Sequence, residues 1–252
     1  MSAFVRRPNL PVRCGAVIIG KKYAEKLAKQ LESLGFSCFF VPDNPYLDPR
    51  LSGHADLSVL HTGGEELLLA PYLKGSSLAE SLAARGAALR FPDVRQSESY
   101  PNDAQFNVCF VGNHILYHEK VVPPKIVDIL TKSDGKAVRC RQGYARCAVC
   151  VVDECSLITA DRGIAAAASA AGISVLRISP GFVRLDGFPY GFLGGASFKL
   201  GKDVMAFTGR LDAHPDRGRI MDFLKERQIR PLYLTDEEIF DIGTAIPILE
   251  KE

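Results

Sequence analysis

The sequence lacks the motifs by which many nucleotide-binding proteins are recognised. No Gly-x-Gly-x-x-Gly opens a helix after a strand, and no Gly-Lys-Ser/Thr marks a phosphate-binding loop. With 31 basic and 29 acidic residues the net charge is only +2, and Lys and Arg are scattered along the chain. A gathered basic face or arm is what holds a nucleic-acid backbone. We therefore expect neither a nucleotide site of these kinds nor a nucleic-acid partner.

Long apolar stretches and a disulfide framework are missing too. The longest apolar runs, such as Val108–Val111 and Ala165–Ala171, are far shorter than a membrane-spanning helix. The N-terminal residues have no apolar stretch of the kind found in secretory signals. Seven cysteines, an odd number without the spacing of a small disulfide-linked domain, indicate reduced thiols. We expect a cytoplasmic protein with no membrane contact, and no cofactor is implied.

What the sequence does contain is a unit repeated about five times: an apolar strand, a tight turn, a second strand, a helix and a third strand. The first strands are expected to open near Cys14, Ala55, Phe106, Cys147 and Ala196, roughly every forty to fifty residues. The length of 252 residues allows one domain or two, and the repeat favours a single domain. Because a hairpin precedes each helix, a ring of small sheets is favoured over one doubly wound parallel sheet.

The fourth unit is the clearest. Its pattern predicts a strand at Ala148–Val152, a two-residue turn at 153–154 and a partner strand at Ser156–Thr159. Asp161 is expected to cap a helix of alanines, and Ser174–Ile178 reads as the third strand. Each unit should therefore carry an antiparallel pair beside a parallel crossover.

The first unit has one strand too few. The late apolar run Thr244–Leu249 is a candidate for the missing strand, and its pairing with the first unit would close head and tail into a ring. Pro247 counts against this because proline cannot donate to a strand ladder.

Five such units closed by a C-terminal strand resemble the pentein fold, the five-bladed α/β propeller of the guanidine-modifying enzymes. Gly194-Gly195 is similar to the glycine-rich segment that precedes the nucleophilic cysteine in those enzymes. In this chain Ala196 and Ser197 follow instead, and no cysteine occurs beyond Cys155. The resemblance thus implies the fold, while the missing late cysteine argues against the usual covalent chemistry. Non-catalytic penteins are known, so the fold alone does not decide the function.

In a ring of this kind the segments that lead into the first strands converge on one central opening, where small ligands usually bind. The two long loops, 92–105 and 179–195, should lie on the same side and close over a ligand. The pair His54 and Asp56 either belongs to this site or satisfies a local loop, and Asn102-Asp103 also fits an ordinary turn. The candidate ligand-binding residues are Asn102, Asp103, Asn107, Tyr144, Arg146, Asp186, Tyr190 and Ser197.

The cysteines Cys140, Cys147, Cys150 and Cys155 are close enough in sequence to suggest a metal site. With a turn at 153–154, Cys150 and Cys155 share one face of the hairpin and Cys147 points to the other. Three thiols then cannot reach one tetrahedral zinc ion, so we expect no metal and two buried, apolar-packed cysteines. Cys147 should face the opening, where a nearby cation would favour its thiolate.

Two functional hypotheses of different class follow. In the first, the protein binds a small polar molecule with a guanidinium or amine, without covalent chemistry. The ligand would lie against Asp56, Asp103 and Asp186, with Tyr190 as a stacking wall.

In the second, the chain is a carbon–nitrogen hydrolase. Cys147 is its nucleophile, His54 the base and Asp56 the residue that orients the base. This requires the Cys147 sulfur within about 4 Å of a His54 ring nitrogen, and a separation beyond about 8 Å would exclude it.

A third and weaker hypothesis is a protein-interaction ring, which would have an open polar channel.

Overall fold

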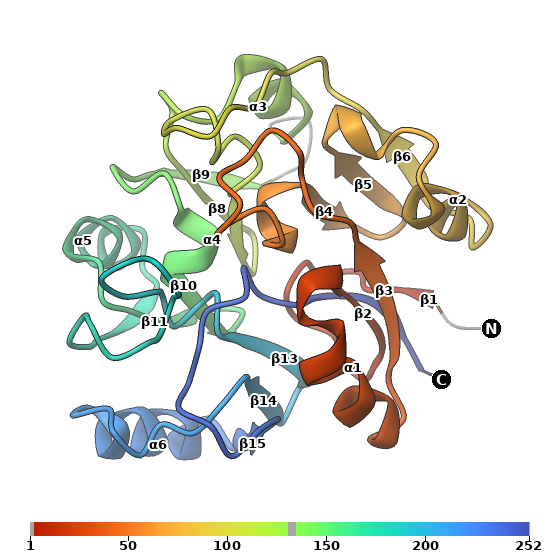
Figure 1. Ribbon diagram of the computed structural model, residues 1–252. Coiled ribbons are helices and arrows are strands. Elements are labelled where there is room, and N and C mark those ends of the chain that lie inside the picture. Colours follow the sequence, from red (N-terminus) through yellow and green to blue (C-terminus); the bar gives the residue numbers. More distant parts are fainter. Residues whose placement is uncertain (1–2, 131–134, 252) are drawn as a thin grey trace.

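A computed structural model describes residues 3–130 and 135–251 of the chain. Five small sheets stand around a common centre, as Figure 1 shows. The chain therefore forms the expected five-bladed α/β propeller.

The fourth blade has the predicted composition. Its antiparallel pair consists of β10 (Val149–Asp153) and β11 (Ser156–Thr159), and β11 pairs in parallel with β12 (Ser174–Arg177). The helix α5 (Arg162–Ala170) crosses between β11 and β12. The Asp161 carboxylate accepts a hydrogen bond from the Ile164 amide at 2.7 Å, so this residue caps the helix as predicted.

Three other blades repeat this order, each with an antiparallel pair followed by a parallel one. In the second blade the elements are η2 (Ala55–Leu57), β4 (Val59–Gly63), β5 (Glu66–Leu69), η3 (Pro71–Leu73), α2 (Ser77–Ala83) and β6 (Ala88–Arg90). In the third they are β7 (Cys109–Val111), β8 (His114–Tyr117), α3 (Pro124–Leu130) and β9 (Lys136–Arg139). In the fifth they are β13 (Ser197–Gly201), β14 (Val204–Phe207), α6 (Arg217–Glu226) and β15 (Arg230–Tyr233).

The first blade is completed by the end of the chain. The C-terminal strand β16 lies between β1 and β2 and is antiparallel to both, so the predicted closure is confirmed. The register shifts between Pro247 and Leu249, which shows how the strand accommodates a residue without an amide donor. Figure 1 shows β1 beside the C-terminal strand of the described chain. The elements of this blade are β1 (Ala3–Phe4), β2 (Cys14–Gly20), η1 (Lys21–Tyr23), α1 (Ala24–Ser33), β3 (Ser37–Val41) and β16 (Ile246–Glu250).

The strands are apolar on both faces because every blade packs against two neighbours. In β5, Leu67 and Leu69 pack with Ile18 of the first blade, whereas Leu68 packs with Phe106 beside the third blade. Five clusters of this kind join neighbouring blades, and one of them joins the first blade to the fifth. The helices α2, α3, α5 and α6 lie at the rim (Figure 1). None of the helices in the described parts of the chain is long and apolar enough to cross a membrane.

Two local predictions are wrong, and they concern the ends of the inner strands. Ala55 and Cys147 do not open strands, because they lie in the helical turns η2 and α4 (Ala145–Ala148), just before β4 and β10. Asp153 pairs with Ser156, so the hairpin turn is at 154–155 rather than at 153–154. As a result Cys155 lies in the turn and is exposed, although Cys150 is buried as expected.

Candidate functional site

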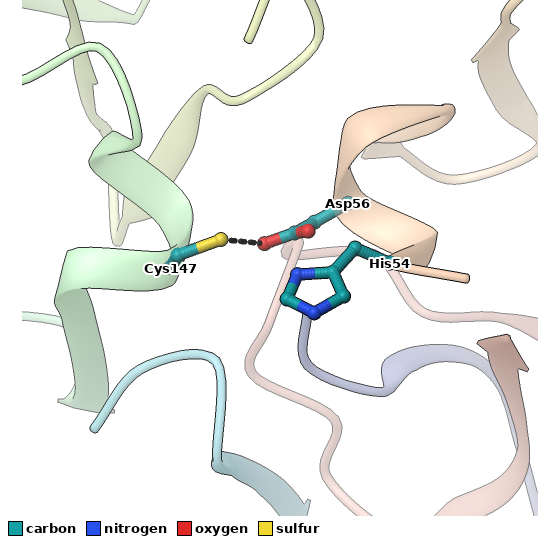
Figure 2. A group of neighbouring side chains, drawn as sticks. All are labelled: His54, Asp56 and Cys147. Carbon is teal, nitrogen blue, oxygen red and sulfur yellow. Dashed lines mark hydrogen bonds between the residues drawn. The ribbon is translucent and has the colours of Figure 1, made fainter. Parts of the chain in front are cut away.

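The helical turns before the inner strands bring residues from different blades together at the ring centre. His54 directly precedes η2 in the second blade, and Cys147 lies in α4 before the fourth. Figure 2 shows the side chains of His54, Asp56 and Cys147 turned toward one another. All three are buried, with 2–3% of their surface exposed. Residues separated by about ninety positions in sequence thus form one cluster.

The Cys147 thiol is held by two hydrogen bonds. It donates to Asp56 Oδ2 at 2.8 Å and accepts from Asn107 Nδ2 at 3.4 Å. Asn107 also accepts from the amides of Arg146 and Cys147 at 2.6 and 3.2 Å, so it fixes the start of α4. The ligand-capable atoms of His54, Asp56 and Cys147 all lie within 4.8 Å of one another. The Cys147 sulfur therefore lies within 4.8 Å of a His54 ring nitrogen, well below the separation of about 8 Å that would exclude the hydrolase hypothesis.

Burial controls the protonation of this cluster. It raises the pKa of the Cys147 thiol well above its usual value, and the nearby carboxyls of Asp56 and Asp241 raise it further. The expected stabilisation of a thiolate by a cation is therefore wrong. Burial also lowers the pKa of His54 to about 3 and raises that of Asp56 to about 6. At neutral pH the site holds a protonated thiol, a neutral imidazole and an ionised Asp56.

Asp241 is a site residue that the sequence reading missed. It is 3% exposed and accepts from the amides of Phe192 and Gly243 at 2.8 and 2.9 Å. Despite these bonds, burial raises the pKa of its carboxyl to about 7, and Asp56 adds to the rise. A signal was available, because Asp241 lies in the segment leading into β16, which is the inner strand of the first blade.

A cavity of about 270 Å³ opens above this cluster. His54, Cys147 and Asp241 contribute its polar groups. The loop 179–195 supplies part of its wall, as expected, and Tyr190 stands there with 43% of its surface exposed. The other lining residues are Leu51, Leu57, Tyr144, Leu185, Phe188, Pro189 and Phe192. We call this space the site cavity.

Asp103 and Arg146 have roles other than those predicted. Asp103 accepts a hydrogen bond from the Tyr144 hydroxyl at 2.5 Å and so holds a wall residue of the site cavity. Arg146 is 4% exposed, and its guanidinium donates to Asn9 Oδ1, to the Gly194 carbonyl and to Thr244 Oγ1 at 2.8–3.3 Å. The Arg146 side chain therefore fills the ring centre with contacts inside the protein. The interaction-ring hypothesis would require an open polar channel there.

Three predicted site residues are not brought to the cavity. Asn102 is exposed on its turn. Asp186 is exposed as well and forms an ion pair with Arg184 at 3.5 Å. Ser197 is buried, but its hydroxyl donates to the Leu193 carbonyl at 2.7 Å and satisfies the local backbone. Of the two predicted loops, 179–195 lines the site cavity and 92–105 contributes no lining residue, and the sequence did not resolve which side chains face the cavity.

The donor set of His54, Asp56 and Cys147 also suits a divalent cation that accepts nitrogen, oxygen and sulfur ligands, such as Zn²⁺. In tetrahedral zinc sites the ligands lie about 2.0–2.3 Å from the ion, so two ligand atoms of one ion lie roughly 3.5 Å apart. The 2.8 Å between the Cys147 sulfur and Asp56 Oδ2 is shorter than that, and the thiol donates a hydrogen bond to the carboxylate. The present arrangement is therefore that of a hydrogen-bonded cluster.

Solved structures of guanidine-modifying enzymes share this fold. An inosamine-phosphate amidinotransferase from Streptomyces griseus superposes with a TM-score of 0.61 at 10% identity, covering 100% of this chain and 98% of that one. DDAH from Pseudomonas aeruginosa, in complex with citrulline, gives 0.58 at 9% identity over 92% and 96%. A C. jejuni agmatine deiminase with substrate bound gives 0.56 at 8% identity over 98% and 96%. These proteins are members of the pentein superfamily, and the chain has the pentein fold.

Comparisons of sequence give a different kind of result. A family model described as a family of unknown function (DUF6873) matches residues 18–246. A search of curated protein sequences finds no match. The sequence comparisons thus leave the activity open.

The first prediction concerns the carboxylate beside the thiol. We expect Asp56→Asn to speed the reaction of Cys147 with iodoacetamide at pH 7, because loss of the negative charge lowers the thiol pKa. Each unit of pKa lowering should give roughly a tenfold larger thiolate fraction. Peptide mass spectrometry that follows each cysteine separately measures this rate.

Asp103→Asn is the matched control, since that carboxylate holds Tyr144 and not the thiol. The rate at exposed Cys155 serves as the internal reference. A slower Cys147 reaction in Asp56→Asn would instead identify Asp56 as the base that takes the thiol proton.

Proposed function

The chain belongs to the family of unknown function DUF6873, and we propose that it binds a small organic cation, a guanidinium or an amine, in the site cavity. The observation that carries this proposal is the buried carboxyl of Asp241 on the cavity surface, with Asp56 close enough to raise its pKa. Two carboxyls in a low-dielectric site repel each other when both are ionised. A cationic ligand removes that repulsion and so favours their ionised forms.

The walls of the site cavity support the same ligand class. Tyr144, Phe188, Tyr190 and Phe192 surround it, and aromatic faces attract organic cations. The fold relatives are guanidine-modifying enzymes, among them an agmatine deiminase. Both features favour a cation with an apolar body.

The same walls disfavour a ligand that also carries a carboxylate. Of the described residues that line the site cavity, none is Lys or Arg. Arg50 stacks on the Phe188 ring at 4.4 Å, but its guanidinium is already bound to the Asp48 carboxylate. A free amino acid such as arginine would therefore bury a carboxylate without a partner, at a cost in affinity. We propose an alkylguanidinium or alkylamine in preference to an amino acid.

A second candidate function is the hydrolysis of a carbon–nitrogen bond in that ligand. The observation that favours it is the convergence of Cys147, His54 and Asp56 beside the site cavity. The Cys147 thiol would pass its proton to His54 as its sulfur attacks the guanidinium carbon, and the breaking C–N bond would release an amine that takes this proton from His54. Water would then cleave the sulfur-bound intermediate to a urea and restore the thiol. A bound cation also offsets the negative charges that keep the thiol protonated.

The second prediction tests ligand class and site together. We expect n-butylguanidine to bind more tightly than arginine in isothermal titration calorimetry, because only arginine brings an unpartnered carboxylate into the site cavity. Asp241→Asn should weaken n-butylguanidine binding by roughly tenfold or more, since it removes a charge-assisted hydrogen bond.

Asp186→Asn is the control for this experiment, because Asp186 is exposed and lies outside the site cavity. It should leave the dissociation constant unchanged. Equal affinity of the Asp241→Asn variant, or tighter binding of arginine, would contradict the proposal.

The third prediction is the pH dependence of that binding. The carboxyl pKa values of about 6 for Asp56 and about 7 for Asp241 are raised by burial. The cation binds the ionised forms, so affinity should be full above pH 8 and fall as the pH drops through 7 and 6. The fall should approach tenfold per pH unit for each carboxyl that is titrated. Calorimetry between pH 5 and 8.5 measures it, and a flat profile would count against the carboxylates.

The fourth prediction separates binding from catalysis. If the protein hydrolyses its ligand, Cys147→Ser should abolish release of amine from n-butylguanidine and retain binding within a few fold, because the serine keeps the size of the side chain. A fluorometric amine assay and calorimetry on the same variant give the two readings. Binding without amine release by the unaltered protein would reject the hydrolase and leave the binding function in place.

A further inference from the structure

A second cavity lies at the opposite end of the ring. In the second to fifth blades the inner strand starts on the side of the site cavity and ends at its hairpin, so the hairpin turns gather at the far end. The N-terminal segment 5–13 crosses this end: the Gly64 amide donates to the Val5 carbonyl at 3.0 Å and the Lys202 amide to the Val12 carbonyl at 3.2 Å. Between this segment and the hairpins of the fourth and fifth blades is a cavity of about 400 Å³. We call it the hairpin-end cavity.

Lys199 is a buried cation that lines this cavity. It lies on β13, where alternation points Phe198 and Leu200 into the cluster shared with the first blade and Lys199 to the other face. Only 2% of its surface is exposed. Its ammonium donates to the Lys202 carbonyl at 2.7 Å, which leaves two of its three N–H donors without a described partner. Burial lowers its pKa to about 8, so a nearby negative charge would stabilise its charged form.

The carboxylates around the hairpin-end cavity do not supply that charge freely, because each has its own partner. Glu154 forms an ion pair with Arg7. Glu250 accepts a hydrogen bond from the Val12 amide at 2.6 Å. Asp153 accepts from the Cys155 amide at 2.9 Å and lies 3.5 Å from Arg227.

Two more cations at this cavity have no such partner. Within the described chain, the side chains of Arg6 and Lys202 make no hydrogen bond or ion pair, and both are exposed at the rim. Together with Lys199 they present three cationic groups to one space whose acidic groups are already engaged. A buried ammonium with spare donors, flanked by guanidinium and ammonium groups, is the arrangement that recognises an oxyanion.

We propose that the hairpin-end cavity binds a small molecule through a carboxylate or phosphate group held by Lys199, Arg6 and Lys202. The oxyanion accepts the two spare N–H donors of Lys199 in the interior, and the two rim residues complete its neutralisation. This site lies at the other end of the propeller from the cation site, and it uses none of the residues on which the proposed function rests.

Calorimetric titration with inorganic phosphate and, separately, with citrate tests this site, with ionic strength held constant by potassium chloride. We expect saturable binding of at least one of these probes. Lys199→Met should weaken it by at least about tenfold, because a charged donor is lost from the interior. The variant should fold, since an apolar side chain of similar length replaces a buried charge. Lys29→Ala, an exposed lysine on α1, is the control and should bind normally.

Thermal unfolding of each variant shows whether it is folded. If Lys199→Met does not fold, the double variant Arg6→Ala and Lys202→Ala decides, because both positions are exposed: weaker binding supports the site and unchanged binding overturns it. The proposal is also overturned if Lys199→Met binds as tightly as the unaltered protein, or if the unaltered protein shows no saturable binding of either probe up to about 10 mM. Titration of n-butylguanidine into Lys199→Met should give the unaltered affinity.

Discussion

The pairing of the C-terminal strand β16 with β1 and β2 is the constraint on which the rest of the fold depends. Every sheet is apolar on both faces, so an open row of five sheets would leave one such face of the first blade and one of the fifth exposed to water. Closure buries those two faces against each other and so removes the free-energy cost of exposing their apolar surface to water. Closure also brings the starts of the five inner strands together at the ring centre. His54, Cys147 and Asp241 therefore come together although they are far apart in sequence.

The same convergence creates an electrostatic conflict. His54, Asp56, Cys147 and Asp241 are all buried, and burial disfavours the charged form of each. Their hydrogen bonds to amides and to one another satisfy several polar atoms, but His54 Nε2 and Asp56 Oδ1 have no described partner. Such atoms are costly in a folded protein unless a ligand or water completes them. The proposed cationic ligand would donate a hydrogen bond to the unpaired Asp56 oxygen and would offset the repulsion between the Asp56 and Asp241 carboxylates.

Repetition made the fold predictable, since the strand order of the fourth blade, an antiparallel pair followed by a parallel one, recurs in three others. It also indicated that His54 and Cys147 lead toward the centre. The positions of individual side chains were not predictable to the same degree, because a turn one residue later places Cys155 in water and because Asp186 is exposed on its loop beside Arg184. Asp241 was missed because no candidate was taken from the segment before Thr244–Leu249, although that run was expected to supply the first unit's missing strand and forms its inner strand β16.

Arg146 adds to the hydrogen bonds that make two buried carboxyls tolerable, which come from the Cys147 thiol to Asp56 and from the Phe192 and Gly243 amides to Asp241. Its guanidinium donates to neutral acceptors of three segments, at Asn9, Gly194 and Thr244, so its donors are used in holding the ring centre together. Because none of these acceptors is charged, the positive charge is not cancelled by a direct ion pair. It acts through space on Asp56 and Asp241 and lowers the pKa of both against the effect of burial. Arg146 thus joins three segments at the ring centre and, together with the hydrogen bonds that each carboxyl accepts, keeps both carboxyls within reach of ionisation near neutral pH.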